Sequence, residues 1–375
     1  MNALRRLSAL LKREVLEILR DPFRLSAAFI VPGVMMLIFG FGLSVDIEQV
    51  PFAALDQDRT PASRDYIDHF ARNRYFADQG VARSRAELTE RLRTGELKMA
   101  LEIPPGFGRD LTAGRVPQVA ILADGTMPFR AETVRSYAEA MHLALIQRLA
   151  QEKAGADTAL MPASVETRYW YNQALKSRVT FVPGLIAVIL TIVPAMLTAV
   201  AVVREKELGS ITNLYATPVT RLEFLLGKQL PYAVISYLNF ILLAVAAVLL
   251  FGVPLKGSVA ALALGAALAV LCSTGIGMLI SAFTRSQAAA LLITMILTLV
   301  PSFLYSGLLT PVSGLGPGGT AFAYGTPTMY FLNITVGAFS KGLALADLAP
   351  NLGALALFFV GLTAVSTVLV KKQGA

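Results

Sequence analysis

The sequence has one cysteine and two histidines in 375 residues, so sites that need several of these side chains are excluded. The single cysteine, Cys272, cannot form a disulfide or a paired-thiol site within the chain. His69 and His142 each lack a second histidine or a cysteine at metal-ligand spacing. Both fall on predicted helices, where a solvated or packed histidine is the expected interpretation, and no metal site is predicted.

Catalytic and nucleotide-binding motifs are also missing. Neither G-x-S-x-G nor H-E-x-x-H occurs in the chain. Gly227-Lys228 resembles the end of a phosphate-binding loop, but Gln229 stands in place of Ser or Thr and Leu222 in place of the first glycine. Three carboxylates directly follow predicted strands: Asp56, Asp58 and Asp124. They are candidates for a metal or acid–base role, but a role in a turn is favoured at such positions. We therefore expect no enzyme activity and no cofactor bound by this chain.

Charged residues are scarce as well. They make up 15% of the chain, against 55% hydrophobic residues and a mean hydropathy of +0.61, which excludes a solvated globule. A bilayer core of about 30 Å needs about 20 mostly apolar residues per helix. Six uncharged runs reach that length: 25–43, 179–203, 230–253, 258–284, 286–310 and 348–370. The sequence predicts six transmembrane helices.

Lys and Arg are distributed unevenly between the two sides of these runs. Thirteen lie on one side, in the N-terminal stretch, the loop after the second run, the loop with Arg285 and the tail, against only Lys256 and Lys341 in the short loops of the other. Because basic loops stay in the cytoplasm, both termini are predicted to be cytoplasmic and residues 45–178 to lie outside. This outer segment has 18 basic and 18 acidic side chains, so the whole net charge of +8 belongs to the membrane part. Attraction to a lipid membrane with anionic headgroups is favoured over binding of nucleic acid.

The predicted fold class is a polytopic α-helical membrane protein with six transmembrane helices and an inserted extracytoplasmic α/β domain. In that domain, strands at 51–55, 99–103 and 119–122 alternate with helices at 63–73, 85–94 and 129–153. Five apolar residues at helical spacing predict an interfacial helix before the first span: Leu4, Leu7, Leu11, Val15 and Ile18. The expected parts are a cytoplasmic amphipathic helix (1–24), the first transmembrane helix (25–44), the extracytoplasmic domain (45–178), transmembrane helices two to six (179–370) with an outer re-entrant or loop segment (311–346), and a cytoplasmic tail (371–375).

A dense group of charges, Arg204 to Glu207, separates the second apolar run from the third. Leu208, Ile211, Leu214 and Tyr215 share one helical face after it, and Pro218 stops the pattern, which predicts a short cytoplasmic helix within 204–222. This helix is either a solvated connector or a lever on which a cytoplasmic partner acts.

The six runs contain no Asp, Glu, His or Lys, which argues against a proton-driven transporter. Their polar groups are neutral, and each either bonds to a helix or lines a translocation path. The candidates for such a path are Thr191, Thr198, Asn239, Thr298 and Ser302.

An ordered set of short motifs resembles the membrane subunit of type-2 ABC exporters. The central ones are Glu205-Lys206-Glu207-Leu208-Gly209-Ser210, Thr217-Pro218 and Gly227-Lys228. Further motifs are similar to the subgroup with a large extracytoplasmic domain after the first transmembrane helix: Arg20-Asp21-Pro22, Phe39-Gly40-Phe41-Gly42, Asp56-Gln57-Asp58, Ile103-Pro104-Pro105-Gly106-Phe107 and Pro327 to Phe331. One departure is Asn333-Ile334-Thr335-Val336, where an arginine is expected.

The resemblance implies the permease subunit of an ATP-binding cassette exporter in the bacterial inner membrane. Such a subunit pairs with a second copy or a close homologue, moves a drug, lipid or glycolipid-like substrate outward, and uses ATP and Mg bound by a separate ATPase subunit. Its outer domain docks a periplasmic adaptor or shapes substrate exit. Seven residues carry over as those coupling to the ATPase: Arg204, Glu205, Lys206, Glu207, Gly209, Thr217 and Pro218. The alternative is a membrane-anchored sensor or receptor with an extracytoplasmic ligand-binding domain, against which the short tail after Val370 argues.

Overall fold

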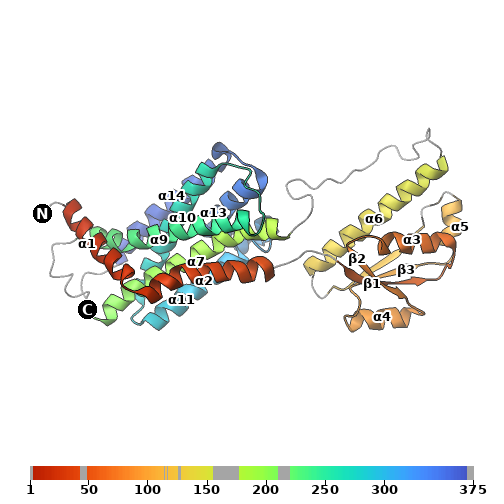
Figure 1. The fold of residues 1–375 in the computed structure, drawn as a ribbon, viewed down its shortest axis with the longest axis horizontal. Coiled ribbons are helices and arrows are strands. Elements are labelled where there is room, and N and C mark those ends of the chain that lie inside the picture. Colours follow the sequence, from red (N-terminus) through yellow and green to blue (C-terminus); the bar gives the residue numbers. More distant parts are fainter. Residues whose placement is uncertain are drawn as a thin grey trace. The chain divides into compact units, whose positions relative to one another are not determined.

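The computed structural model describes residues 3–42, 49–113, 115, 117–125, 128–154, 177–209 and 220–369. The chain divides into two compact units (Figure 1). One is helical and comprises Met1–Ser44 with Tyr169–Ala375, and the other comprises Val45–Arg168. The predicted tail at 371–375 and the last part of the predicted outer domain, 155–176, lie outside the described residues.

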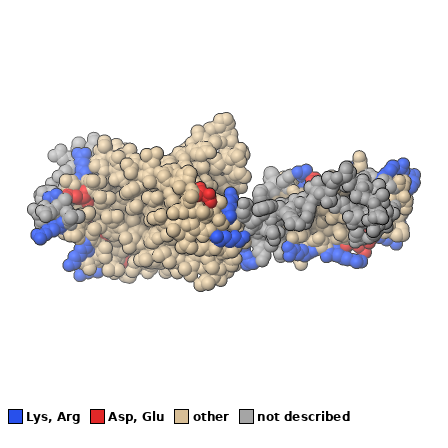
Figure 2. Space-filling model, turned by 90° about the horizontal axis from the view of Figure 1, so that it is seen from above, with Lys and Arg blue, Asp and Glu red and all other residues tan. Residues whose placement is uncertain are grey.

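The helical unit is built from long apolar helices. Its first segments are α1 (Ala3–Leu19) and α2 (Pro22–Gly42), followed after the second unit by α7 (Ser177–Glu207), α9 (Arg221–Leu249), α10 (Val259–Phe283), α11 (Gln287–Leu304) and α14 (Leu345–Leu369). Among the described residues, six helices are long and apolar enough to cross a membrane: α2, α7, α9, α10, α11 and α14. On the face shown in Figure 2, the sides of this unit carry almost no charge, and Lys and Arg gather toward its ends. These features are those of a polytopic membrane protein.

Serine and threonine caps set where several of these helices begin. The hydroxyls of Ser258 and Ser286 accept hydrogen bonds from the first turns of α10 and α11, so both helices begin where the apolar runs do. Thr220 and Glu223 form a capping box at the start of α9. The third membrane helix therefore begins at Arg221, nine residues before the predicted run. The fifth membrane helix ends at Leu304, six residues before its predicted end.

Helix α7 is the centre of the helical unit. Every residue from Phe181 to Ala195 is buried, and α7 packs against α2, α9, α10, α11 and α13. The approach to α10 is close, because a Cβ added at Gly277 would lie 2.2 Å from the carbonyl oxygen of Ala195. A glycine at this contact lets the two helix backbones approach within van der Waals distance.

Short helices fill the segment between α11 and α14, which was predicted as re-entrant or loop. They are the 3₁₀ turn Val312–Gly314, α12 (Pro317–Tyr324), α13 (Pro327–Val336) and the π-helical turn Gly337–Lys341. At 1.5 Å per residue, α13 is roughly 15 Å long, about half of a bilayer core. It packs against α7, α10 and α14, so this part of the segment is a buried helix and not a solvated loop.

The second unit is an α/β fold with a four-stranded mixed sheet. Its elements are β1 (Val50–Asp56), α3 (Pro61–Ala71), β2 (Phe76–Val81), α4 (Arg85–Arg93), β3 (Met99–Ile103), α5 (Phe107–Thr112), β4 (Ala120–Ala123) and α6 (Pro128–Ala154). The strand order is β2-β1-β3-β4, with β1 parallel to both neighbours and β4 antiparallel to β3. Helices α3 and α6 cover one face of the sheet and α4 the other (Figure 1).

Alternation along the strands explains the two layers of this core. Phe52 and Ala54 of β1 face α3 and α6, whereas Ala53 and Leu55 face α4. Strand β2 and helix α5 were not predicted. Strand β2 is a polar edge strand in which only Phe76 is buried, and α5 has six residues, too few for a helical period to show.

Candidate functional site

The charged group after the second apolar run does not begin a helix of its own. Arg204, Glu205, Lys206 and Glu207 form the last turn of α7, and a turn with Gly209 at φ +70° follows. The outer bounds predicted for a separate helix, 204–222, are therefore too wide, because residues 204–207 belong to α7 and Arg221 and Leu222 to α9. The middle of the predicted helix, residues 210–219, lies outside the described residues, and the helix there stays a prediction. Thr217 and Pro218, the remaining residues predicted to couple to an ATPase, lie outside the described residues.

Glu205 is the centre of a group of ion pairs between three buried side chains and the exposed Arg13, which we call the ion cluster: Arg13, Glu14, Glu205 and Lys228. Its carboxylate lies 2.7 Å from Nζ of Lys228 and 3.3 Å from the guanidinium of Arg13. Lys228 also bonds to the carboxylate of Glu14. The side chains of Glu14, Glu205 and Lys228 are at most 6% exposed, so solvent screens these charges little. The ion cluster joins α1, α7 and α9.

Hydrogen bonds extend the ion cluster to α2. The hydroxyl of Tyr232 donates to Glu14 at 3.1 Å and accepts from Arg24 at 2.9 Å. Asp21, in the turn between α1 and α2, pairs with Arg204 at 2.9 Å. The pKa of Asp21 is lowered, first by the hydrogen bond from the backbone N–H of Arg24 and then by Arg204. This carboxylate therefore stays ionised and holds the end of α7 beside the start of α2.

Lys206 and Glu207, the other two charged residues in the last turn of α7, connect α7 with α10 and α11. Nζ of Lys206 donates to the carbonyl oxygens of Ser281 and Thr284 at the end of α10, where a cation is favoured by unpaired carbonyls. Glu207 accepts from the backbone N–H of Gln287 at 2.8 Å and from its side chain, at the start of α11. One helical turn of α7 thus contacts the ends of both helices.

Helix α1 packs tightly on α9 beside the ion cluster. Arg6 pairs with Glu223 at 2.8 Å, and a Cβ added at Gly227 would lie 3.0 Å from Cβ of Leu10. Gly227 therefore permits the close approach that brings Glu14 to Lys228. The sequence did not single out Glu14, although it falls on the stripe of Leu7, Leu11 and Ile18; a carboxylate on such a stripe is a signal of a buried partner.

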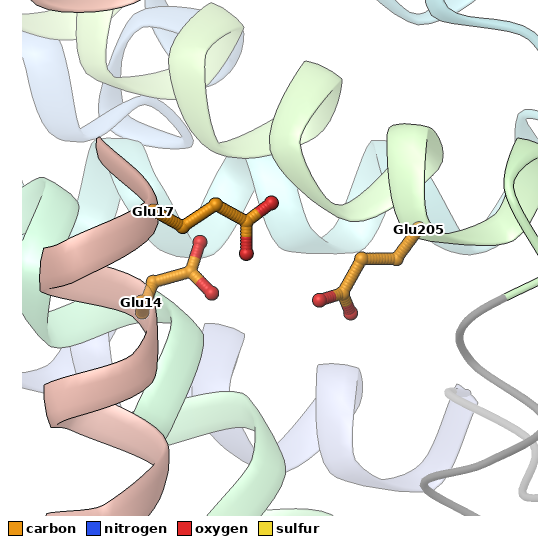
Figure 3. A group of neighbouring side chains, drawn as sticks. All are labelled: Glu14, Glu17 and Glu205. Carbon is orange, nitrogen blue, oxygen red and sulfur yellow. The ribbon is translucent and has the colours of Figure 1, made fainter. Parts of the chain in front are cut away.

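Three carboxylates of this region, Glu14, Glu17 and Glu205, face one another from α1 and α7 (Figure 3), with ligand atoms within 4.8 Å. By ligand type alone such a group could hold a cation. Lys228 already bonds to both Glu14 and Glu205, however, so its ammonium group supplies the positive charge there. The arrangement is that of an ion-pair network.

The five residues predicted for a translocation path are all buried, and their hydrogen bonds go to their own or neighbouring helices. Thr198 and Thr298 donate to carbonyls one turn back, and Asn239 of α9 donates to the carbonyl of Ala28 in α2. Thr191 of α7 and Ser302 of α11 both bond to the hydroxyl of Thr328 in α13, which the sequence did not single out. A role in a path stays a prediction.

The carboxylates considered for a metal or acid–base role make turns and caps. Asp58 accepts the backbone N–H groups of Gly106 and Gly108 at 2.8 Å each and the hydroxyl of Thr60 at 2.6 Å; these bonds, that of Thr60 foremost, lower its pKa. Asp56 accepts bonds within its own turn and from Ser63. The turn interpretation is confirmed for Asp56 and Asp58, whereas Asp124 pairs with Lys98.

The two histidines and the cysteine are also accounted for by packing. His142 of α6 is half-buried and hydrogen-bonded to the hydroxyl of Tyr66 at 2.9 Å, and burial lowers the pKa of its ring. His69 is half-buried on α3. Cys272 is buried in α10, and its thiol lies against the carbonyl oxygen of Leu355 in α14.

The sequence matches the model of the ABC-2 family transporter protein over residues 24–368. It is 30% identical over 367 residues to a protein named "Probable multidrug ABC transporter permease YbhS" of Escherichia coli, covering 97% of each chain. It is 25% identical to "Probable multidrug ABC transporter permease YbhR" over 341 residues (91% of each chain) and 27% identical to "Inner membrane transport permease YhhJ" over 331 residues (84% of this chain and 86% of the relative), both of Escherichia coli. Since the family match extends over almost the whole chain and includes all six membrane helices, the chain belongs to the ABC-2 family of transporter membrane proteins, and its general role is that of a transport permease.

Proposed function

We propose that this chain is the permease subunit of an exporter that is driven by ATP hydrolysis on a separate ATPase subunit, which binds the ATP and Mg. Family membership supports this proposal over a sensor or receptor, and the relatives named as multidrug permeases support export of a drug-like or lipid-like substrate. The chain itself is then a non-catalytic subunit that moves the substrate out of the cytoplasm or the inner leaflet.

The observation that carries the proposal is the set of bonds around the last turn of α7. Within four residues, Arg204, Glu205, Lys206 and Glu207 bond to the α1–α2 turn, to α1 and α9, to α10 and to α11. A displacement of this turn must therefore move or break contacts with the ends of all these helices. Such a position suits the contact through which an ATPase drives rigid-body motion of membrane helices.

The ion cluster is also suited to exchange of partners. The second carboxylate oxygen of Glu205 is buried and accepts no hydrogen bond from any described residue. Buried polar atoms are nearly always satisfied, so an unsatisfied one marks strain or a state that rearranges. In our proposal, docking of the ATPase changes which cation Glu205 contacts and so shifts α1 against α7 and α9.

The orientation we propose places the ion cluster on the cytoplasmic face of a bacterial inner membrane. The N-terminal stretch 5–24, the last turn of α7 and the start of α9 carry ten of the 17 Lys and Arg outside the α/β unit, as expected for the cytoplasmic side. Both termini are then cytoplasmic and the α/β unit lies outside, where it docks an adaptor protein or shapes substrate exit. A second copy or a close homologue completes the translocation path.

The substrate we propose is amphiphilic. Among the described residues, the deeper parts of the spans offer hydroxyl and amide groups, such as Thr191, Asn239 and Ser302, and no ionised side chain. Small ions need charged or carbonyl ligands to replace their hydration, whereas an amphiphile needs an apolar path with a few hydrogen bonds.

The proposal is tested by co-purification and by transport-coupled ATP hydrolysis in reconstituted vesicles. The full chain, extracted in mild detergent, is expected to retain an ATPase in equal numbers. The double variant Glu205→Gln/Glu207→Gln is expected to insert normally but to lose most of the substrate-stimulated hydrolysis. The matched control is Glu90→Gln/Glu139→Gln, which removes two exposed ion pairs of the α/β unit. Unchanged stimulation in the first variant, or a stable preparation that never binds an ATPase, would contradict the proposal.

A further inference from the structure

A groove of about 780 Å³ lies beside the ion cluster, between α1, the α1–α2 turn and the end of α7. It is lined by Ala9, Lys12, Arg13, Leu16, Glu17, Arg20, Asp21, Pro22 and Arg204. The coupling contacts described above account for only part of this lining.

The groove carries an excess of positive charge. Four of its side chains are basic and two are acidic, which leaves a net charge of +2. Arg13 pairs with Glu205 and Arg204 with Asp21, so these two cations are already compensated. The cations that remain are Lys12 and Arg20, which are exposed and have no ion-pair partner within the part of the chain that the structure describes.

The two acidic residues compensate these cations only in part. Asp21 is bonded to Arg204 and to the backbone of Arg24. The carboxylate of Glu17 lies on the side of the ion cluster, within 4.8 Å of the carboxylates of Glu14 and Glu205. Lys12 and Arg20 together therefore exceed by one charge the carboxylate of Glu17, which also lines the groove.

Apolar side chains on α1 lie exposed beside these cations. Val15 is 42%, Leu16 43% and Leu19 60% exposed. In an amphipathic helix such as α1 the polar side is expected to face water, so apolar side chains on the exposed side call for an apolar partner. Lys12, Leu16 and Arg20 follow one another at intervals of four residues, which places Lys12 and Leu16 on one face of α1 and Arg20 just beyond its end. The surface thus combines cations with apolar groups, the two parts that a phospholipid requires.

The position of the groove along the chain indicates which anion it meets. Pro22, in its lining, is the first residue of α2, and the part of α2 that is long and apolar enough to cross the membrane begins at Arg24. A groove at the start of a transmembrane helix lies at the level of lipid headgroups, where Lys and Arg contact phosphate oxygens and apolar side chains contact acyl chains.

We propose that this groove binds the phosphate headgroup of an anionic phospholipid, held by Lys12 and Arg20, with its acyl chains against Leu16 and Leu19. The lipid fastens α1 to the membrane face and occupies the space next to Arg13 and Arg204. The same phosphate chemistry could come from free phosphate, but phosphate alone leaves the exposed leucines in water. An anionic lipid covers both the cations and the leucines.

The test measures lipid retention by the purified full chain in a neutral detergent, using native mass spectrometry with phosphatidylglycerol or phosphatidylcholine. Phosphatidylglycerol is expected to be retained in preference. Lys12→Gln/Arg20→Gln should weaken its binding by roughly 30-fold, since each basic residue near a membrane surface contributes about fivefold. The matched control is Arg5→Gln/Arg221→Gln, which removes two exposed cations from the same end of the unit; because neither lines the groove, it should weaken binding far less than Lys12→Gln/Arg20→Gln does.

Three results would overturn the proposal. Equal loss of lipid in both double variants would mean that only the overall charge matters. Displacement of the lipid by millimolar inorganic phosphate would identify a phosphate-ion site. Normal lipid retention in Lys12→Gln/Arg20→Gln with loss of a co-purifying ATPase would identify a protein-docking surface. Hydrogen exchange of the α1 amides checks that each variant remains folded, and because lipid retention is measured without ATP, its outcome is independent of the proposed transport function.

Discussion

Replacement of Lys228 by methionine tests whether the ion cluster holds α1 in place. The side chain of Lys228 is 6% exposed and bonds to both Glu14 and Glu205. Methionine keeps most of the length and the apolar stem of lysine but removes the charge. Two buried carboxylates from α1 and α7 are then left close together without the ammonium group between them. We expect α1 to separate from α7 and α9 more often.

The magnitude follows from what remains after the substitution. Breaking a buried ion pair costs about 3–5 kcal/mol, because the partner charge is left uncompensated. Arg13 still contacts Glu205 and the hydroxyl of Tyr232 still donates to Glu14, so the lower end, about 3 kcal/mol, applies. Since about 1.4 kcal/mol is a factor of ten, local opening of α1 should become roughly 150-fold more frequent. Adding Glu14→Gln removes one of the two uncompensated charges and should restore part of this loss.

Hydrogen exchange of the α1 amides in detergent measures this opening directly. Lys341→Met serves as the control, because Lys341 is an exposed lysine on the same unit. The expected order of α1 exchange rates is Lys228→Met fastest, then Lys228→Met/Glu14→Gln, then the control and the unmodified chain together. Equal rates for Lys228→Met and Lys341→Met would refute the reasoning, as would faster exchange on adding Glu14→Gln.

Three further predictions concern packing and pH. Asp58→Ala should lower the free energy of unfolding of the α/β unit by about 2 kcal/mol, because the backbone N–H groups of Gly106 and Gly108 lose a charged acceptor. Hydrogen exchange of the core amides of this unit measures the change. Burial lowers the pKa of His142 in the folded unit, so the stability that this side chain contributes is present above the unfolded pKa of about 6.5 and is lost as the pH falls below that value. Hydrogen exchange of the same core amides at pH 7.5 and at pH 5 should show this loss of stability. The variant His142→Gln should lose less stability between the two pH values. Gly277→Ala should destabilise the helical unit in detergent unfolding by about 1–3 kcal/mol, because the new Cβ meets the main chain of α7, whereas Gly361→Ala, which has open space around it, should not.

The membrane helices were predictable because the bilayer imposes a simple requirement on length and charge. Runs of about 20 apolar residues are needed to cross it, and the caps Ser258 and Ser286 stand at the ends of such runs in the sequence. In the α/β unit, strands with buried faces, such as β1 and β3, were predicted for a similar reason. Strand β2 was missed because an edge strand needs few buried residues, so its composition resembles a loop.

The candidate site was only partly predictable, because its partners are far apart in the chain. Glu14 and Lys228 are 214 positions apart, and no local pattern connects them. The sequence did identify the charges of α7 and, through the family motif, Gly227 and Lys228. It did not indicate that Gly227 is the point of close approach to α1, since this depends on how two helices pack. Local patterns identify elements, and pairs between elements require the fold.

The misplaced start of the third helix has a physical cause that changes how the charged group is interpreted. Hydropathy treats a charge as the end of a membrane helix, so Lys228 and Glu223 moved the predicted start to residue 230. In the structure both are inside α9, where Glu223 caps the helix and pairs with Arg6 while Lys228 is neutralised by two carboxylates. The charges at 204–207 and 221–228 are consequently the ends of two membrane helices and not parts of one independent helix. A force applied to either of these ends therefore acts directly on a helix that is long and apolar enough to cross the membrane.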